Sequence, residues 1–272
     1  MRKIVLTLIF LTGLIIVLYP LVTKIYYNYD MSRQSAVLLE QFQVNSDDQK
    51  QRYIAQRRSN EELAMNQPTP DSPAVEVKKN DRQKEEMIGD DIIATVKIPA
   101  LKLHYPVYER ATPESLNRGV SRVIGTSFPV GGRSTNSVLA AHSYSPFHEW
   151  FTHIDRLKNG DQIIINNFKE TLYYRVYDRV IVTPDHVEAM AIKKGRDIVT
   201  LLTCTPSGQE RLLIYAERTT KNGQKVVSEP KRPLEHRYHL IDNLKVLAES
   251  WYVIGIVIIL TLIFIIFLRQ EK

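Results

Sequence analysis

The amino-acid sequence predicts an all-β folded domain, a closed barrel or a sandwich, in a chain with an apolar helix near each end. Three observations lead to this fold class. Residues 90–220 contain short runs of β-branched and aromatic residues separated by turn-forming residues. Residues 4–22 and 251–268 are uncharged and largely apolar. Residues 30–66 contain neither Gly nor Pro and place apolar residues at helical spacing.

The first apolar stretch, residues 4–22, follows Arg2 and Lys3. Its length is close to the roughly 20 residues that cross a bilayer as a helix. A cleaved signal peptide needs a shorter apolar core followed by a cleavage site of small residues. In this chain the apolar stretch ends with Tyr19, Pro20 and other bulky residues instead. We therefore expect residues 1–24 to form an uncleaved membrane anchor.

A second transmembrane helix is expected over residues 250–268, with Trp251 at one interface and a short tail, residues 269–272, beyond the other. Two spans place both chain ends on one side of the lipid bilayer and the middle of the chain on the other. Basic residues flank the spans on both sides, and we assign the ends to the cytoplasm. Residues 221–249 are expected to be a juxtamembrane linker.

The segment that follows the anchor, residues 25–66, is expected to be helical, because Phe42, Tyr53 and Leu63 recur among polar residues with nothing to break a helix. Such a helix is either a solvated stalk or a segment that packs on the folded domain. Residues 67–89 begin with several prolines and continue with charged residues. This composition is typical of a linker or a lid loop.

The folded region, residues 90–220, consists of short strands separated by turns such as Ser207-Gly208. Pro106 lies within the second strand, and because proline has no N–H to donate, it predicts an edge strand. Residues 146–157 are the helix expected in this region. The expected strands cover residues 92–98, 102–108, 137–142, 162–166, 172–182, 198–202 and 211–219.

Composition excludes several classes of function. Lys and Arg total 36 against 30 for Asp and Glu, a net charge of +6, and half of that excess lies at the extreme ends of the chain. The remainder is too small and too dispersed to predict nucleic-acid binding. One cysteine cannot form a zinc-type Cys/His cluster, and the seven histidines show no HExxH spacing. We therefore expect no metal and no organic cofactor.

The single cysteine, Cys204, is the main candidate for chemistry. It ends a buried strand at a Thr-Pro-Ser-Gly turn, His142 ends an equivalent strand, and Arg211 opens the strand after the turn. A thiol beside a histidine and a cation is an arrangement for covalent catalysis, because positive charge favours the nucleophilic thiolate. The alternative is that Cys204 is a small buried hydrophobe, the commonest role of a free cysteine.

Two of these candidates have rivals nearby. His148 and His153 lie close to His142 in sequence, but both fall on the predicted helix. Arg218 lies on the same strand as Arg211, seven positions away. Side chains alternate along a strand, so the two arginines point to opposite faces and one of them at most can reach the thiol.

The run TLLTCTP at residues 200–206, the strand that ends at His142 and the strand that begins at Arg211 resemble the TLxTC box, histidine and arginine of sortases, the cysteine transpeptidases of Gram-positive bacteria. IPALKLHYPVY at residues 98–108 and GTSFPVGG at residues 125–132 are similar to the same family. Two apolar ends and a long N-terminal segment resemble class C, the pilin-polymerising branch. The resemblance covers residues 90–220 and implies a closed β-barrel of about eight strands with short helices, held outside the cell.

The resemblance implies a membrane-anchored transpeptidase of the cell wall that cleaves an LPXTG-like sorting signal after Thr. Cys204 would be the nucleophile of a hydrolase-like first step, His142 the general acid and base, and Arg211 the stabiliser of the oxyanion or substrate. Its substrates would be pilins or other surface proteins with C-terminal sorting signals, joined to a pilin lysine during pilus assembly. A wall-anchoring sortase, using an amine of a peptidoglycan precursor, is one alternative; a non-enzymatic membrane-tethered β-domain for binding or scaffolding is another.

Class C sortases usually carry an Asp-Pro-aromatic motif in a lid over the site. The nearest match in this chain is Asp71-Ser72-Pro73, without an aromatic residue, so Asp71 and Pro73 are candidate lid residues and an ordinary loop is the alternative. Thr203 and Thr205 flank the cysteine and are candidate supports of the site, with plain strand-edge hydroxyls as the alternative.

Overall fold

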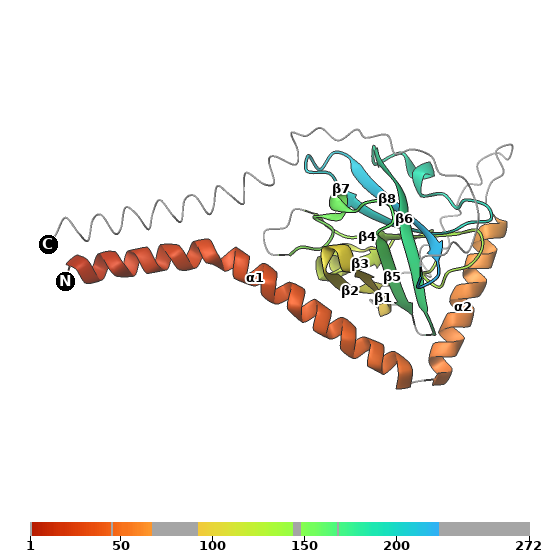
Figure 1. Ribbon diagram of the computed structural model, residues 1–272, viewed down its shortest axis with the longest axis horizontal. Coiled ribbons are helices and arrows are strands. Elements are labelled where there is room, and N and C mark those ends of the chain that lie inside the picture. Colours follow the sequence, from red (N-terminus) through yellow and green to blue (C-terminus); the bar gives the residue numbers. More distant parts are fainter. Residues whose placement is uncertain (1, 45, 67–91, 144–147, 168, 223–272) are drawn as a thin grey trace. The chain divides into compact units, whose positions relative to one another are not determined.

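The computed structural model describes residues 2–44, 46–66, 92–143, 148–167 and 169–222 (Figure 1). The expected linker or lid at 67–89, nearly all of the juxtamembrane linker at 221–249, the C-terminal span at 250–268 and the tail at 269–272 lie outside the described residues. The chain divides into two compact units, and residues 28–145 and 149–234 make up the unit that contains the sheet.

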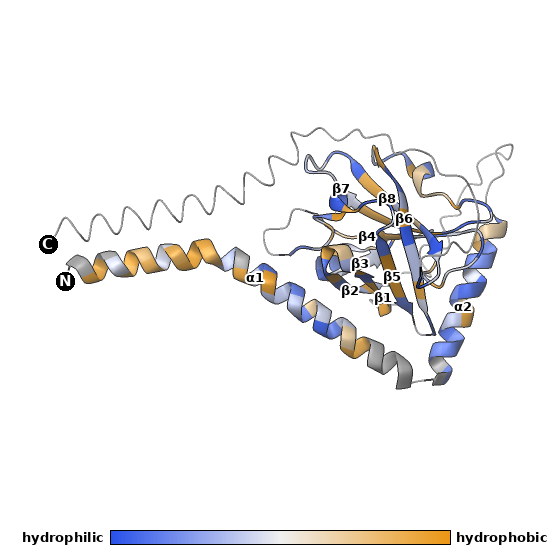
Figure 2. Ribbon diagram, in the orientation of Figure 1, coloured by the Kyte–Doolittle hydropathy of each residue, from blue (hydrophilic) through white to orange (hydrophobic). Residues whose placement is uncertain are grey.

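Two helices precede the sheet, α1 (Arg2–Val44) and α2 (Ser46–Met65). Within α1, residues Thr7–Leu38 are long and apolar enough to cross a membrane, by length and composition. Figure 2 shows the apolar residues concentrated in the first half of α1. The helix continues without a break from the expected anchor into the expected stalk and includes Pro20.

Helix α2 packs on the sheet through side chains spaced three or four residues apart, Tyr53, Gln56 and Asn60, all of them buried. The Tyr53 hydroxyl donates a hydrogen bond to Glu170 Oε1 at 2.9 Å. Asn60 donates to the carbonyl of Phe128 at 3.0 Å and accepts from its N–H at 2.7 Å. These contacts hold α2 against the sheet-containing unit.

Eight strands form a closed barrel in the order β1-β2-β3-β4-β7-β8-β6-β5. The barrel confirms the all-β prediction and selects the barrel over the sandwich. Strands β2–β3 and β4–β7 pair in parallel, and the other neighbours pair antiparallel. The strands are β1 (Ile92–Ile98), β2 (Leu103–Tyr108), β3 (Val120–Arg122), β4 (Thr135–Ala140), β5 (Gln162–Asn167), β6 (Thr171–Val182), β7 (Asp197–Cys204) and β8 (Arg211–Thr219).

The core of this unit consists mainly of apolar side chains. Each fully buried aliphatic or aromatic side chain contributes about 1.5–3 kcal/mol through removal of its surface from water. Short helical turns connect the strands: η1 (Pro99–Leu101), α4 (Pro113–Arg118), η2 (Ile154–Arg156) and η3 (Val187–Met190). The largest side chains with almost no exposed surface are Tyr105, Tyr174, Phe151, Ile93, Ile98, Leu139, Ile154, Leu157, Ile163, Ile165, Leu172 and Ile198.

The prediction that Pro106 marks an edge strand is wrong. Strand β2 lies between β1 and β3 in the closed barrel. On the β3 side, pairing involves only Val107 and Tyr108 of β2. Pro106 is tolerated in an internal strand because it precedes this short parallel pairing.

The prediction of a helix over residues 146–157 is also wrong. In the described part of that stretch the chain forms turns and then the short η2. Trp150 has a φ of 33°, which interrupts a right-handed helix, and the Phe151 N–H donates to the carbonyl of His142 at 3.1 Å. Sequence reasoning missed α4, whose signal is a capping box formed by Thr112 and Ser115.

Candidate active site

Cys204 is the last residue of β7 and is partly exposed. The strand ends there because Pro206 cannot donate to a sheet and Gly208 turns the chain. Gly208 has a φ of 73°, which favours glycine, and its N–H donates to the carbonyl of Thr205 at 2.8 Å. The thiol therefore lies at the rim of the barrel, between a rigid strand and a tight turn.

His142 follows the end of β4, which pairs in parallel with β7. The register places Ala140 opposite Leu202, and the Ala141 N–H donates to the carbonyl of Leu202 at 3.2 Å. His142 and Cys204 are each two residues beyond that last pair. Parallel register thus brings the histidine to the level of the cysteine. The imidazole also lies beside the indole of Trp150, with ring centroids 5.4 Å apart.

Arg211 is the first residue of β8 and the Cα partner of Cys204 across the antiparallel β7–β8 pair. Directly opposed residues of a sheet start from the same face, so the side chains of Arg211 and Cys204 leave the backbone on one side. Nη1 donates to the carbonyls of Gly208 and Glu210, both at 3.1 Å. These bonds fold Arg211 over its own turn, whereas Nε and Nη2 make no hydrogen bond within the described part of the chain.

Two hydroxyl groups tie the end of β4 to the end of β7. Thr203 Oγ1 donates to the carbonyl of Ala141 at 2.8 Å in a buried position, and Ser143 Oγ donates to the carbonyl of Cys204 at 2.9 Å. These bonds lie on either side of His142 in the sequence. Sequence analysis singled out Thr203 but missed Ser143, for which a hydroxyl immediately after the histidine is the available signal.

Thr205 acts within the turn. Its Oγ1 lies 3.0 Å from Ser207 Oγ, and its N–H donates to the carbonyl of Glu210 at 3.1 Å. These contacts lie within the six residues that separate the ends of β7 and β8. Thr205 therefore shapes the connection between Cys204 and Arg211.

The rival residues have other partners. His153 pairs with Glu149 at 3.1 Å, and Arg218 pairs with Glu170 at 3.8 Å and Asp197 at 3.7 Å. Arg218 lies at the far end of β8, seven residues from the rim where Arg211 lies. His148 belongs to the other compact unit. Asp71 and Pro73, the candidate lid residues, lie outside the described residues.

The structure brings the backbones of Cys204, His142 and Arg211 to one rim without joining their side chains. Within the described part of the chain, no hydrogen bond or ion pair links any two of the three. Such bonds often form only when a substrate is bound, so this geometry is compatible with catalysis. Among the described residues no group of three or more His, Cys, Asp or Glu side chains is arranged to hold a metal ion.

A loop containing η3 covers the sheet beside the rim. The Tyr215 hydroxyl donates to the carbonyl of Ala189 at 2.8 Å, and Asn136 Nδ2 donates to that of Met190 at 2.9 Å. Thr200, on the same strand as the cysteine, donates to Asn136 Oδ1 at 2.8 Å. Ala189 and Met190 pack against Ile198, Leu213 and Tyr215, with partly buried Leu202 beside them.

The cations of this loop lie over two tyrosine rings. Lys193 Nζ is 4.9 Å from the ring centroid of Tyr215, and the Arg196 guanidinium is 4.3 Å from that of Tyr177. Burial raises the pKa of Tyr177 to about 12 and also raises the pKa of Tyr215. Both phenols therefore stay neutral at physiological pH, so these contacts are cation–π interactions. The loop is held by apolar packing, hydrogen bonds and cation–π contacts together.

Comparison with known proteins relates this chain to one protein family. The model of the sortase domain matches residues 96–219. Sortase A of Bacillus anthracis is 33% identical over 113 residues, which are 42% of this chain and 52% of that protein. The match thus spans about half the length of that relative.

Solved structures match over a larger share of the chain. Sortase C from Clostridium perfringens SM101 is 30% identical, with a TM-score of 0.56, and the match covers 69% of this chain and 99% of that one. A second structure of C. perfringens sortase C, with the C-terminal cell wall sorting motif, has a TM-score of 0.58, 30% identity, and covers 69% and 98% of the two chains.

The fold is thus a closed barrel with a cysteine, a histidine and an arginine at one rim. The chain belongs to the sortase family, whose members are cysteine transpeptidases.

Proposed function

We propose that this chain is a cysteine transpeptidase that uses Cys204, His142 and Arg211. The observation that carries the proposal is the register of three neighbouring strands: β4, β7 and β8 bring these residues to one rim. A partly exposed thiol at the end of a rigid strand is accessible to a peptide. The hydroxyls of Thr203 and Ser143 fix the two strand ends relative to each other.

In the first step the Cys204 thiolate attacks the threonine carbonyl of the sorting signal, and a carbon–sulfur bond forms. Arg211 donates to the oxyanion of the tetrahedral intermediate through Nε or Nη2, since a guanidinium has five donors and stays charged. His142 transfers a proton to the departing amine as the carbon–nitrogen bond breaks. The result is a thioester between Cys204 and the N-terminal part of the substrate.

In the second step an acceptor amine attacks the thioester carbonyl. His142 takes the proton that this amine loses, the carbon–sulfur bond breaks, and Cys204 returns to the thiolate. The acceptor thus ends in a new amide bond. Because the rim holds a single acyl group, the identity of the amine that reaches it decides the biological product.

The substrate is, in this proposal, an LPXTG-like sorting signal at the C-terminus of a surface protein, and the acceptor is a pilin lysine. Two findings support this choice. Sortase C structures of 30% identity match nearly their whole length, and one of them carries a C-terminal cell wall sorting motif. Wall anchoring through a peptidoglycan amine is the second candidate, supported by the 33% identity to a sortase A.

We further propose that α1 anchors the enzyme in the cell membrane of a Gram-positive bacterium, with the barrel outside the cell. The apolar stretch Thr7–Leu38 supports an anchor by its length and composition. The two-span arrangement with cytoplasmic ends depends on residues 250–268 and is proposed from their sequence alone.

An immunoblot of surface proteins tests the function in cells that carry Cys204→Ala at the native locus. Loss of an SDS-resistant ladder with accumulation of monomers supports pilin polymerisation. An unchanged ladder with monomers shed from the wall supports wall anchoring. No change in the ladder or in the shed monomers would contradict a transpeptidase and favour a non-enzymatic β-domain for binding or scaffolding.

A further inference from the structure

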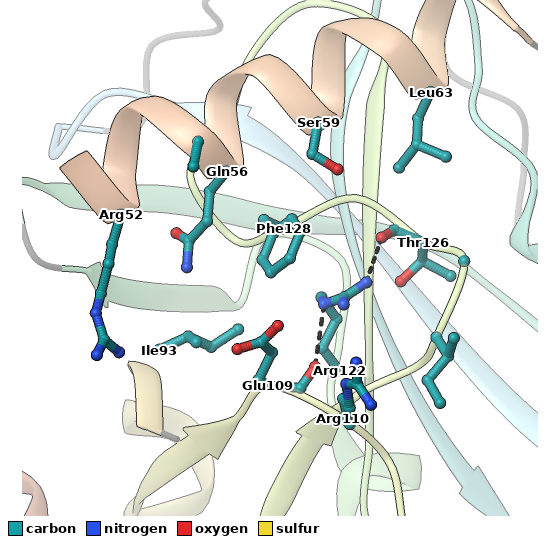
Figure 3. A pocket seen from close by; sticks show the side chains of 13 residues that line it. Arg52, Gln56, Ser59, Leu63, Ile93, Glu109, Arg110, Arg122, Thr126 and Phe128 are labelled. Carbon is teal, nitrogen blue, oxygen red and sulfur yellow. Dashed lines mark hydrogen bonds between the residues drawn. The ribbon is translucent and has the colours of Figure 1, made fainter. Parts of the chain in front are cut away.

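A cavity of about 540 Å³ lies between α2 and the barrel, apart from the rim residues Cys204, His142 and Arg211. Its wall is formed by one face of α2, the start of β1, the end of β2 and the chain from Arg122 to Phe128 (Figure 3). Pockets of roughly 300–1,000 Å³ are typical of small-molecule sites. The cavity is therefore large enough for a ligand of the size of a modified amino acid.

The cavity wall carries an excess of positive charge. Arg52, Arg110 and Arg122 line it together with one carboxylate, that of Glu109. The three arginines come from α2, from the residues after β2 and from β3, so the fold and not one sequence motif brings them together. A concave site with this charge attracts anions, because the surrounding protein screens less than water does.

Two of these arginines differ in their hydrogen bonding. Arg122 is held in place: its Nε donates to the carbonyl of Glu109 at 3.1 Å, its Nη1 donates to that of Thr126 at 2.7 Å, and it lies 4.0 Å from the ring centroid of Phe128. Arg110 makes no hydrogen bond or ion pair through its side chain within the described part of the chain. Its guanidinium fork is thus available to a carboxylate, which it matches in shape.

Gln56 is the second feature that indicates a ligand. Its side chain reaches from α2 into the cavity in Figure 3 and is only 7% exposed. Its Oε1 is buried and has no hydrogen-bond partner among the described residues. A buried polar atom without a partner costs free energy, which a bound group can recover. A side-chain amide complements another amide, since each offers a donor and an acceptor.

Apolar side chains complete the wall. Ile93 of β1, Phe128 and Leu63 of α2 line the same cavity as the arginines. The cavity therefore combines a guanidinium, an amide and an apolar surface. These are the complements of a carboxylate, a neighbouring amide and an aliphatic side chain.

We propose that this cavity binds an acylated amino-acid carboxylate, as found at the C-terminus of a peptide or in a free N-acyl amino acid. Arg110 binds the carboxylate, Gln56 hydrogen-bonds the amide, and Ile93 and Phe128 contact the aliphatic side chain. The site is separate from Cys204 and does not depend on the proposed transpeptidase activity.

Isothermal titration calorimetry on the full-length chain in detergent tests this site with a matched pair of ligands. N-acetyl-leucine carries the carboxylate, and N-acetyl-leucinamide replaces it with a neutral amide. We expect saturable binding of the acid and about tenfold or more weaker binding of the amide, as for loss of a charge-assisted hydrogen bond. Equal binding of the two compounds, or no saturable binding of the acid, overturns the proposal.

Two variants and a control locate the site. Arg110→Gln is expected to weaken binding of N-acetyl-leucine by about tenfold or more, and Gln56→Leu is expected to weaken it as well. Arg133→Gln removes the same charge from an exposed position outside the cavity and is expected to leave binding unchanged. Equal loss in Arg110→Gln and Arg133→Gln would show unspecific attraction and refute the site. A leucine tripeptide and its C-terminal amide then distinguish a peptide end from a free N-acyl amino acid.

Discussion

Replacement of Thr203 by valine tests how the strand ends at the rim are held together. The Thr203 hydroxyl donates to the carbonyl of Ala141 at 2.8 Å, and both residues are buried. Valine has nearly the same shape as threonine but cannot donate this bond. The carbonyl of Ala141, one residue before His142, would then be left without this donor in a position that water reaches poorly.

The expected loss of stability follows from that burial. Leaving a buried carbonyl without a donor costs about 1–3 kcal/mol in the free energy of unfolding. Because the same bond fixes the residue before His142, we also expect kcat for cleavage of a sorting-signal peptide to fall several-fold. Proton transfer depends on the position of the imidazole, so a small shift of His142 lowers the rate of the reaction.

Urea unfolding and peptide-cleavage kinetics measure the two effects. The control is Thr171→Val, because Thr171 also donates a hydrogen bond, at 2.6 Å to Asn166 Oδ1, but is exposed, so that water replaces the lost partner. We expect a lower urea midpoint with an unchanged slope for Thr203→Val and little change for Thr171→Val. Equal stability and equal kcat in the two variants would refute the argument.

Three further predictions concern single residues. Arg211→Lys is expected to lower the rate of peptide cleavage by about a hundredfold or more. An ammonium group cannot hydrogen-bond the turn carbonyls and at the same time offer planar donors to the oxyanion. A wild-type rate in this variant would show that Arg211 does not stabilise the oxyanion. Asn60→Ala is expected to lower the free energy of unfolding by about 2 kcal/mol, since both hydrogen bonds to Phe128 are lost, whereas Asn117→Ala at an exposed position should change it little, and urea unfolding distinguishes them. Desolvation, followed by the charge of Lys97 across the strand pair, lowers the pKa of His104 below its ordinary value of 6.5, so the unfolded chain binds this proton more readily. Stability should therefore fall as pH drops below the unfolded pKa of about 6.5 toward the lower folded value, and His104→Gln should reduce that fall; identical pH profiles would contradict the assignment.

Much of the barrel could be predicted because its strands have clear patterns and clear ends. The strand expected at residues 211–219 is β8, and that expected at residues 92–98 is β1. Cys204 could be placed at a strand end because the residues that follow it form a turn. The pairing of β7 with both β4 and β8 could not be derived from one strand's pattern, since register depends on contacts between segments far apart in sequence.

The elements that were missed are short and depend on local contacts. Strand β3 has three residues, too few to show alternation. The helix expected at residues 146–157 fails because Trp150 adopts a positive φ, which a pattern of residue types does not reveal. Ser143 was not expected to contact the site because its bond to the Cys204 carbonyl exists only once β4 and β7 are paired.

The most direct test of the account is the intact mass of the chain after incubation with a sorting-signal peptide and no acceptor amine. The account predicts that wild-type protein gains the mass of the peptide up to and including the threonine, and that hydroxylamine removes this mass as expected for a thioester. Cys204→Ala should gain no mass while keeping the unfolding midpoint of the wild type. The same adduct in Cys204→Ala, or peptide cleavage by that variant at the wild-type rate, would contradict the assignment of Cys204 as the nucleophile.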